Sequence, residues 1–152
     1  MAKRAVFGLA GWSGSGKTTL AEKLIKVLSE RGLTVATIKH AHHKFDADMP
    51  GKDSWRHRKA GAGQVLVSSA MRSAHFIEHD REEPSLEMLL ARLNPCDIVL
   101  VEGFKKEAIP KLEIYRGELE LSPLYPEDSH IIALVSDTPP EDCQLPVLAS
   151  AN

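Results

Sequence analysis

Short apolar runs alternate with segments of helical periodicity along most of this chain. Val6–Ala10 and Asp97–Glu102 are nearly continuous in apolar residues, as expected for buried strands of a parallel sheet. Lys17–Arg31 carries apolar residues at helical spacing and is followed by Gly32, a common helix stop. Further strands are expected at Thr34–Ile38, Gln64–Ser68, Ala74–Glu78, Lys111–Tyr115, Ile131–Val135 and Leu145–Leu148, and further helices at Ser54–Ala62 and Ser85–Leu93. This alternation predicts an α/β fold with a mostly parallel sheet flanked by helices.

The length and composition favour one compact domain, residues 1–152. The chain has 152 residues, of which 43% are apolar, enough for a hydrophobic core. Its formal net charge of −2 gives no reason to expect a nucleic acid or a membrane surface as a partner. Cys96 and Cys143 lie far apart and form no C-x-x-C pair, which favours a reducing compartment. Because no apolar stretch is long enough to span a bilayer, we expect a cytoplasmic protein.

The segment Gly11–Thr18 fits the pattern G-x-x-x-x-G-K-[ST] and lies between an expected strand and an expected helix. Its glycines let backbone N–H groups turn toward an anion, and the helix directs the positive end of its dipole at the phosphates. Lys17 supplies a charge for the β- and γ-phosphates, and the Thr18 hydroxyl is a ligand for Mg²⁺. Trp12 is an unusual aromatic here, and we expect it to cover the core edge rather than to stack on a neighbour. The pattern predicts a P-loop NTPase-like fold that binds a nucleoside triphosphate.

A second acidic element is expected beside this loop, because a Mg²⁺–nucleotide site needs a carboxylate at the C-terminal end of a neighbouring strand. Glu102 holds this place, and Gly103 after it lets the backbone pass close to the γ-phosphate. Asp97 begins the same strand, about 16 Å away at about 3.3 Å per residue, and is therefore excluded. Thr18 and Glu102 are the candidate metal ligands, and Lys17 and Glu102 the candidate catalytic residues. The candidate nucleotide-binding residues are Gly11, Ser13, Gly14, Ser15, Gly16, Lys17, Thr18, Thr19 and Gly103.

A polar stretch without apolar periodicity, His40–Asp53, follows the expected second strand. Its histidines are His40, His42 and His43, and its first aspartates are Asp46 and Asp48. These residue types allow a metal site, although their spacing matches no strong zinc pattern, and a solvated loop is the plainer alternative. We favour an anion-binding surface formed together with the basic stretch Lys52–Lys59, whose arginines suit a phosphate clamp. An ordinary charged helix face is the alternative for this stretch. For Asp53 the roles open are the N-cap of the following helix, an indirect Mg²⁺ ligand through water, and a base, and we favour the N-cap.

Taken together, these segments resemble the MobB family, accessory proteins of molybdopterin-guanine dinucleotide biosynthesis. The resemblance runs from residue 5 to about residue 116, about three quarters of the chain. The segment Gly11–Thr18, called the phosphate loop below, does not by itself distinguish this family from others. A histidine-rich segment followed by Pro-Gly-Lys-Asp-Ser and Arg-Lys-Ala-Gly-Ala is much more specific to the family. The segments that carry the resemblance are Gly11–Thr18, Thr37–His43, Phe45–Ser54, Arg56–Ala62 and Asp97–Lys105.

The resemblance implies a homodimer that binds GTP with Mg²⁺ and is at most a weak GTPase, with Lys17, Thr18 and Glu102 in the nucleotide and metal roles. It also implies association with the molybdenum cofactor guanylyltransferase, which attaches GMP to molybdopterin, and with molybdopterin or its guanine dinucleotide. The chain lacks the guanine-reading motif Asn-Lys-x-Asp, so guanine preference is placed elsewhere, near Ser136 and Asp137. Two other functions remain open: a P-loop small-molecule kinase, and a non-catalytic metal- or pterin-binding module that uses the histidines.

Overall fold

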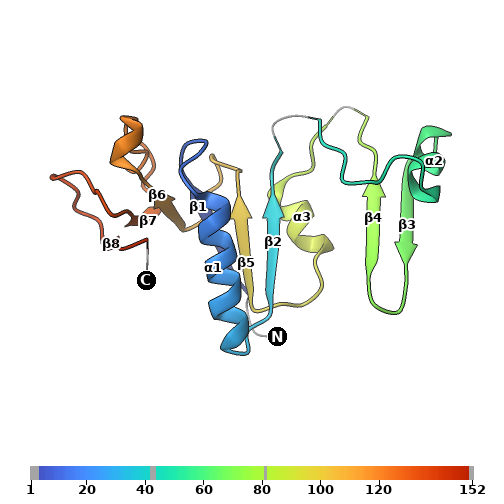
Figure 1. Cartoon of the computed structure of the whole chain (residues 1–152), viewed down its shortest axis with the longest axis horizontal. Coiled ribbons are helices and arrows are strands. Elements are labelled where there is room, and N and C mark those ends of the chain that lie inside the picture. Colours follow the sequence, from blue (N-terminus) through green and yellow to red (C-terminus); the bar gives the residue numbers. More distant parts are fainter. Residues whose placement is uncertain (1–3, 42–43, 81, 151–152) are drawn as a thin grey trace. The chain divides into compact units, whose positions relative to one another are not determined.

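A six-stranded sheet with the order β2-β5-β1-β6-β7-β8 forms the core of the larger part of the chain (Figure 1). Every pair of neighbouring strands in it runs parallel. Its strands are β1 (Ala5–Ala10), β2 (Val35–Lys39), β5 (Ile98–Glu102), β6 (Lys111–Ile114), β7 (Ile131–Val135) and β8 (Val147–Leu148). The predicted α/β class with a mostly parallel sheet is confirmed, and the strand limits differ from the predicted ones by only one or two residues.

The structure is a computed structural model that describes residues 4–41, 44–80 and 82–150, and the chain falls into two compact units. The sheet unit comprises residues 1–40 and 86–152, and the hairpin unit comprises residues 41–85. The apolar pattern by itself does not indicate this division. Within the described ranges, none of the helices combines the length and the hydrophobicity that a membrane span requires.

Two helices of the sheet unit, α1 (Lys17–Glu30) and α3 (Leu86–Arg92), pack on the sheet through separate apolar clusters. The α1 cluster contains Leu20, Ala21 and Leu24 of the helix with Leu9, Leu112, Ile114 and Val135 of the sheet, and the α3 cluster contains Leu86, Leu89 and Leu90 with Val6, Ile38, Val99 and Val101. Val6 and Leu9 fall in different clusters because their side chains point to opposite faces of β1. Each fully buried Val or Leu contributes about 1.5–3 kcal/mol to stability. The predicted flanking of the sheet by helices is therefore confirmed.

Two buried charged residues of β6 tie the segment between β6 and β7 to the sheet. Glu113 has no exposed surface, and its carboxylate accepts hydrogen bonds from the backbone N–H groups of Leu124 (2.7 Å) and Tyr125 (2.9 Å). Burial raises the pKa of Glu113. Lys111 is also buried and pairs with Asp128 at 2.7 Å. The segment contains one short 3-10 helix, η1 (Gly117–Leu119).

The hairpin unit consists of β3 (Gln64–Ser68) and β4 (Ser73–Ile77), which pair antiparallel, and of α2 (Asp53–Lys59). The two strands and the helix confirm the predicted elements. The N-cap of α2 is Lys52, so the prediction that Asp53 caps this helix is wrong by one residue. The Asp53 carboxylate lies in the first helical turn, where the helix dipole still favours a negative charge.

Arg58 of α2 holds the hairpin unit together through three carboxylates. Its guanidinium donates hydrogen bonds to Glu78 (2.6 Å), Asp46 (2.8 Å) and Asp48 (2.9 Å), and it lies 5.4 Å from the centre of the Phe76 ring. These bonds, that to Glu78 above all, raise the pKa of Arg58. The residue thus joins α2, the segment before it and the end of β4.

We expect Arg58→Ala to loosen the hairpin unit, because the substitution leaves three carboxylates close together without their shared cation. Amide hydrogen exchange in β3 and β4 should become faster, while the amides of the sheet unit keep their rates. Arg56→Ala is the matched control, since Arg56 lies on the same helix with an exposed side chain. Equal exchange in the two variants would show that Arg58 does not stabilise the unit.

Candidate functional site

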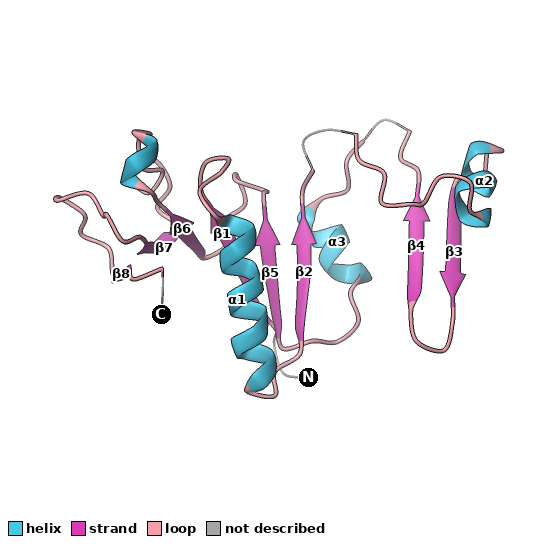
Figure 2. Cartoon of the chain, in the orientation of Figure 1, coloured by secondary structure: helices cyan, strands magenta, loops and turns pink. Residues whose placement is uncertain are grey.

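The C-terminal ends of β1, β2 and β5 lie at one edge of the sheet, where the phosphate loop begins. The parallel register pairs Leu9 with Glu102 and Lys39 with Glu102, so these residues form one row across the three strands. The arrowheads of β2 and β5 point to this edge (Figure 2). Glu102 therefore lies two strand positions below the level of Gly11, as its predicted place beside the loop requires. Asp97 lies at the opposite edge, where its carboxylate accepts the N–H and the hydroxyl of Thr34.

The loop between β1 and α1 has backbone conformations that favour glycine. Gly11, Gly14 and Gly16 have φ angles of 148°, 78° and 102°, which side-chain-bearing residues rarely adopt. A Cβ at Gly11 would lie 2.6 Å from Ser15 Oγ and 2.8 Å from the carbonyl oxygen of Ile114. The predicted glycine loop therefore folds tightly against the end of β6.

The start of α1 lacks the groups that usually satisfy a helix N-terminus. Its N-cap is Gly16, with no side-chain cap, and its first turn contains no acidic residue. The Ser15 hydroxyl is buried and, among the described residues, has no hydrogen-bond partner. The Lys17 ammonium folds back over the loop and donates to the carbonyls of Gly11 (2.7 Å) and Trp12 (2.9 Å). Free N–H groups, an unpaired hydroxyl and a cation meet here, which is the donor set that a phosphate group accepts.

Three lysines, Lys17, Lys39 and Lys105, lie near the Glu102 carboxylate at this edge. Lys39 Nζ lies 3.7 Å from Glu102 Oε1. Burial lowers the pKa of the Lys17 ammonium, and the Glu102 carboxylate partly opposes this shift. The positive charges of Lys105 and Lys39 reinforce it. The edge therefore carries an excess of positive charge suited to a polyanion. The sequence did not assign Lys39 or Lys105 to the predicted nucleotide site, although Lys39 ends β2 and Lys105 follows β5 at this edge.

Trp12 does not cover the core edge, so that prediction is wrong. Its side chain keeps 39% of its surface exposed, and its indole N–H donates to the carbonyl of Ser122 at 2.8 Å. The Lys105 ammonium lies 5.9 Å from the centre of its ring, in the range of cation–π contacts. Trp12 therefore links the phosphate loop to the segment that Glu113 ties to the sheet.

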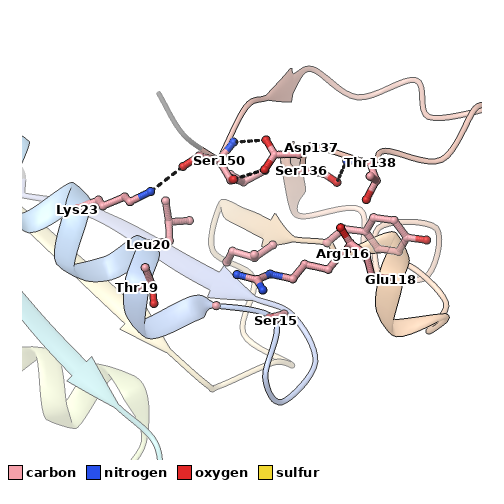
Figure 3. A pocket seen from close by; sticks show the side chains of 14 residues that line it. Ser15, Thr19, Leu20, Lys23, Arg116, Glu118, Ser136, Asp137, Thr138 and Ser150 are labelled. Atoms are coloured by element: carbon pink, nitrogen blue, oxygen red, sulfur yellow. Dashed lines mark hydrogen bonds between the residues drawn. The ribbon is translucent and has the colours of Figure 1, made fainter.

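A cavity of about 240 Å³ lies beside the phosphate loop, within the sheet unit (Figure 3). The loop and α1 contribute Ser15, Gly16 and Thr19, and the ends of β6 and β7 contribute Arg116, Asp137 and Thr138. Ser150 closes one side, where its N–H donates to Asp137 Oδ1 (3.0 Å) and its hydroxyl donates to Oδ2. Ser136 and Asp137, where guanine preference is predicted, thus line a cavity shared with the loop. The remaining candidates, Ser13 and Thr18, are exposed.

The polar stretch after β2 is only partly described, since His42 and His43 lie outside the described residues. The His40 backbone N–H donates to the Glu102 carbonyl (2.8 Å), and its ring lies 4.9 Å from that of Phe104. A Cβ at Gly103 would lie 2.6 Å from His40 Cβ, so Gly103 is required for this close packing.

Among the described residues, no three His, Cys, Asp or Glu side chains are grouped as in a metal site. Arg58 is engaged by carboxylates of its own unit, which contradicts its predicted place in a phosphate clamp.

Comparison with known proteins gives a consistent picture. The family model described as "Molybdopterin guanine dinucleotide synthesis protein B" (MobB) matches residues 6–137. A "Molybdopterin-guanine dinucleotide biosynthesis adapter protein" of Escherichia coli is 46% identical over 138 residues, which are 88% of this chain and 79% of that protein. A protein of the same name from Haemophilus influenzae is 43% identical, over 90% of this chain and 76% of its own length. The crystal structure of Bacillus subtilis MobB matches with a TM-score of 0.70 at 27% identity, covering 94% of this chain and 88% of that one.

We expect Gly11→Ala to be more destabilising than Gly14→Ala. Both positions have positive φ, which costs about 1–2 kcal/mol for alanine, but only at Gly11 would the new methyl group meet the Ile114 carbonyl and Ser15. At Gly14 nothing lies within 4 Å of the added Cβ. Adding a cost of overpacking, Gly11→Ala should lose about 2–5 kcal/mol of unfolding free energy in urea denaturation. Similar losses for the two variants would contradict the close approach at Gly11.

Proposed function

Since the chain belongs to the MobB family, we propose that it acts as an adapter in molybdopterin-guanine dinucleotide biosynthesis and binds Mg²⁺-GTP at Gly11–Thr18. The observation that carries the nucleotide part is the N-terminus of α1, which has no side-chain cap, no acidic residue in its first turn and three glycines in the loop before it. The first N–H groups of this helix need acceptors, and phosphate oxygens supply them. The adapter part is supported by relatives that carry this name and are 43–46% identical.

In this proposal the Lys17 ammonium exchanges its two carbonyl acceptors for oxygens of the β- and γ-phosphates. The partly desolvated position that lowers its pKa also strengthens its attraction to an anion. Lys39 and Lys105 lie at the same edge and balance further negative charge of the triphosphate. The Ser15 hydroxyl is buried beside these groups and offers one more donor.

The residues beside the loop fit Mg²⁺, which prefers oxygen ligands and retains several water molecules. Thr18 is exposed in the first turn of α1, and Glu102 keeps 20% of its side chain accessible at the strand end. These two would hold the ion, Thr18 directly and Glu102 through water. A bound Mg²⁺ would neutralise part of the negative charge of the phosphates.

We expect any hydrolysis to be slow. Among the described residues, the cations beside Glu102 are the lysines Lys17, Lys39 and Lys105, whereas Arg116 meets the loop at Gly16. P-loop GTPases that hydrolyse quickly use an arginine finger, which is worth about 10³–10⁵ in kcat. Lysine is a point charge and cannot clamp the transferred phosphoryl group in the same bidentate way. The Glu102 carboxylate would position the attacking water.

The hairpin unit supports a homodimer in this proposal. A two-stranded sheet is marginally stable by itself, and within the described residues β3 and β4 pair only with each other. Leu66 and Met71 of this hairpin are 65% and 93% exposed. Unpaired strand edges beside exposed apolar side chains are the usual features of a surface that pairs with another chain. The pathway's guanylyltransferase, and molybdopterin or its guanine dinucleotide, complete the proposed set of partners in the cytoplasm.

The first test is Lys17→Ala, which should lower Mg²⁺-GTP affinity by at least about 100-fold, since it removes a cation that makes charge-assisted hydrogen bonds to the phosphates. Binding is measured by calorimetry, and circular dichroism verifies the fold. Lys26→Ala is the matched control on the same helix, with an exposed side chain. Equal GTP affinity in wild type and Lys17→Ala would refute the assignment of the loop.

The second test is Glu102→Gln, which should reduce the rate of phosphate release by about 100-fold while changing GTP affinity much less, because Glu102 acts on water and metal. Asp97→Asn, at the opposite end of the same strand, is the control and should turn over like the wild type. Unchanged turnover in Glu102→Gln would remove this residue from the site. Stoichiometric transfer of the γ-phosphoryl group to molybdopterin, in place of phosphate release, would identify a small-molecule kinase instead.

A further inference from the structure

Asp137 lies in the cavity beside the phosphate loop. Both oxygens of its carboxylate accept hydrogen bonds from one residue, Ser150. Oδ1 accepts the backbone N–H of Ser150 at 3.0 Å, and Oδ2 accepts the hydroxyl of the same residue. Figure 3 shows the two bonds side by side. The two oxygens are therefore directed at one partner that carries two adjacent donors.

This arrangement matches the chemistry of one nucleobase. Guanine carries two adjacent donors, N1–H and the 2-amino group, on a single edge. Adenine offers an acceptor at N1 and only one amino group beside it, so a carboxylate would face a lone pair there. The hydrogen bonds from Ser150 lower the pKa of Asp137, so in this structure the carboxylate acts as an acceptor only.

The position of the cavity suits the base of a nucleotide whose phosphates lie on the loop. Ser15, Gly16 and Thr19 line it, so it is continuous with the phosphate site. Its volume of about 240 Å³ is below the range of about 300–1,000 Å³ that encloses whole ligands, which suits one base with the phosphates outside. Arg116 reaches from the end of β6 to the loop, where its Nη2 lies 3.0 Å from the position of a Cβ on Gly16. A guanidinium there offers a flat face for a base.

The backbone around Asp137 is fixed before any ligand arrives. The Thr138 N–H donates to the Ser136 hydroxyl at 3.1 Å, and the Thr138 hydroxyl accepts the Gly117 N–H at 3.0 Å. These bonds hold the turn after β7 against η1. The contacts of Ser150 are exposed, including the bond from Lys23 to its carbonyl, so their exchange for a ligand costs little.

We propose that Asp137 is the base-reading residue of this chain, and that it accepts N1–H and the 2-amino group of guanine in the place now taken by Ser150. The inference rests on the proposed function, since it needs a nucleoside triphosphate on Gly11–Thr18. Beyond the proposed function, it names Asp137 as the residue that selects guanine, and the N1–H and 2-amino groups as the edge of the base that this residue recognises.

The experiment measures binding of Mg²⁺ complexes of GTP, ITP, XTP and ATP to the full chain by calorimetry. Wild type should bind GTP tighter than ITP, which lacks the 2-amino group, and tighter than ATP, by about tenfold or more. Asp137→Asn should reverse the order of GTP and XTP, because the asparagine amide donates to the 2-oxo group of xanthine. Glu118→Gln is the matched control, since Glu118 is a second carboxylate in the same cavity, and it should keep the wild-type order.

The possible results distinguish a failure of this inference from a failure of the proposed GTP binding. Wild type that binds GTP, with an Asp137→Asn variant that keeps the wild-type order of bases, would overturn the inference alone. A reversal seen in Glu118→Gln would overturn it too. A wild type that binds none of the four nucleotides would overturn the proposed function and the inference with it. Should Asp137→Asn not fold, N1-methyl-GTP decides on the wild type: weaker binding than GTP supports the inference, and equal binding overturns it.

Discussion

The parallel pairing of β1, β5 and β2 is the constraint on which the candidate site depends. It places Leu9, Glu102 and Lys39 in one row, so the loops after these strands begin side by side. Neighbouring strands are about 4.8 Å apart, which is close enough for their end groups to act on one ligand. The row is held by backbone hydrogen bonds and by Val99 and Val101, which have no exposed surface. A register slip of one residue would turn the Glu102 side chain to the other face of β5.

The parts of this structure that could be predicted from sequence have local causes. An apolar run, a glycine loop and a helical repeat each depend on neighbouring residues. From them the strands, α1 and the position of Glu102 at the end of β5 could be predicted. The buried residues Lys111 and Glu113 could not be predicted in this way. Charged side chains in a strand pattern indicate exposure. The carboxylate that pairs with Lys111 lies 17 residues further along the chain, and a backbone N–H that donates to Glu113 lies 11 residues further along.

The same limit applies to the candidate site. Lys17 and Thr18 could be named because a single motif contains them, whereas Lys39, Lys105 and Asp137 come from three different strand ends and share no motif. For Arg58 the sequence predicted too much. A basic stretch indicates anion binding, but the carboxylates of the chain that bond to Arg58 cannot be identified from the stretch itself. Asp46 and Asp48 precede it by 12 and 10 residues, and Glu78 follows it by 20. Only the folded hairpin unit shows that its charge is already balanced.

Trp12 has a consequence for how the protein can be observed. The chain has two tryptophans, Trp12 on the phosphate loop and Trp55 on α2, one in each unit. The Trp12 indole is partly exposed, bonded to Ser122 and close to a lysine ammonium, and its fluorescence depends on all three. A Trp55→Phe protein would therefore carry a single tryptophan, on the phosphate loop. Loop movements could then be followed in real time without attaching any label.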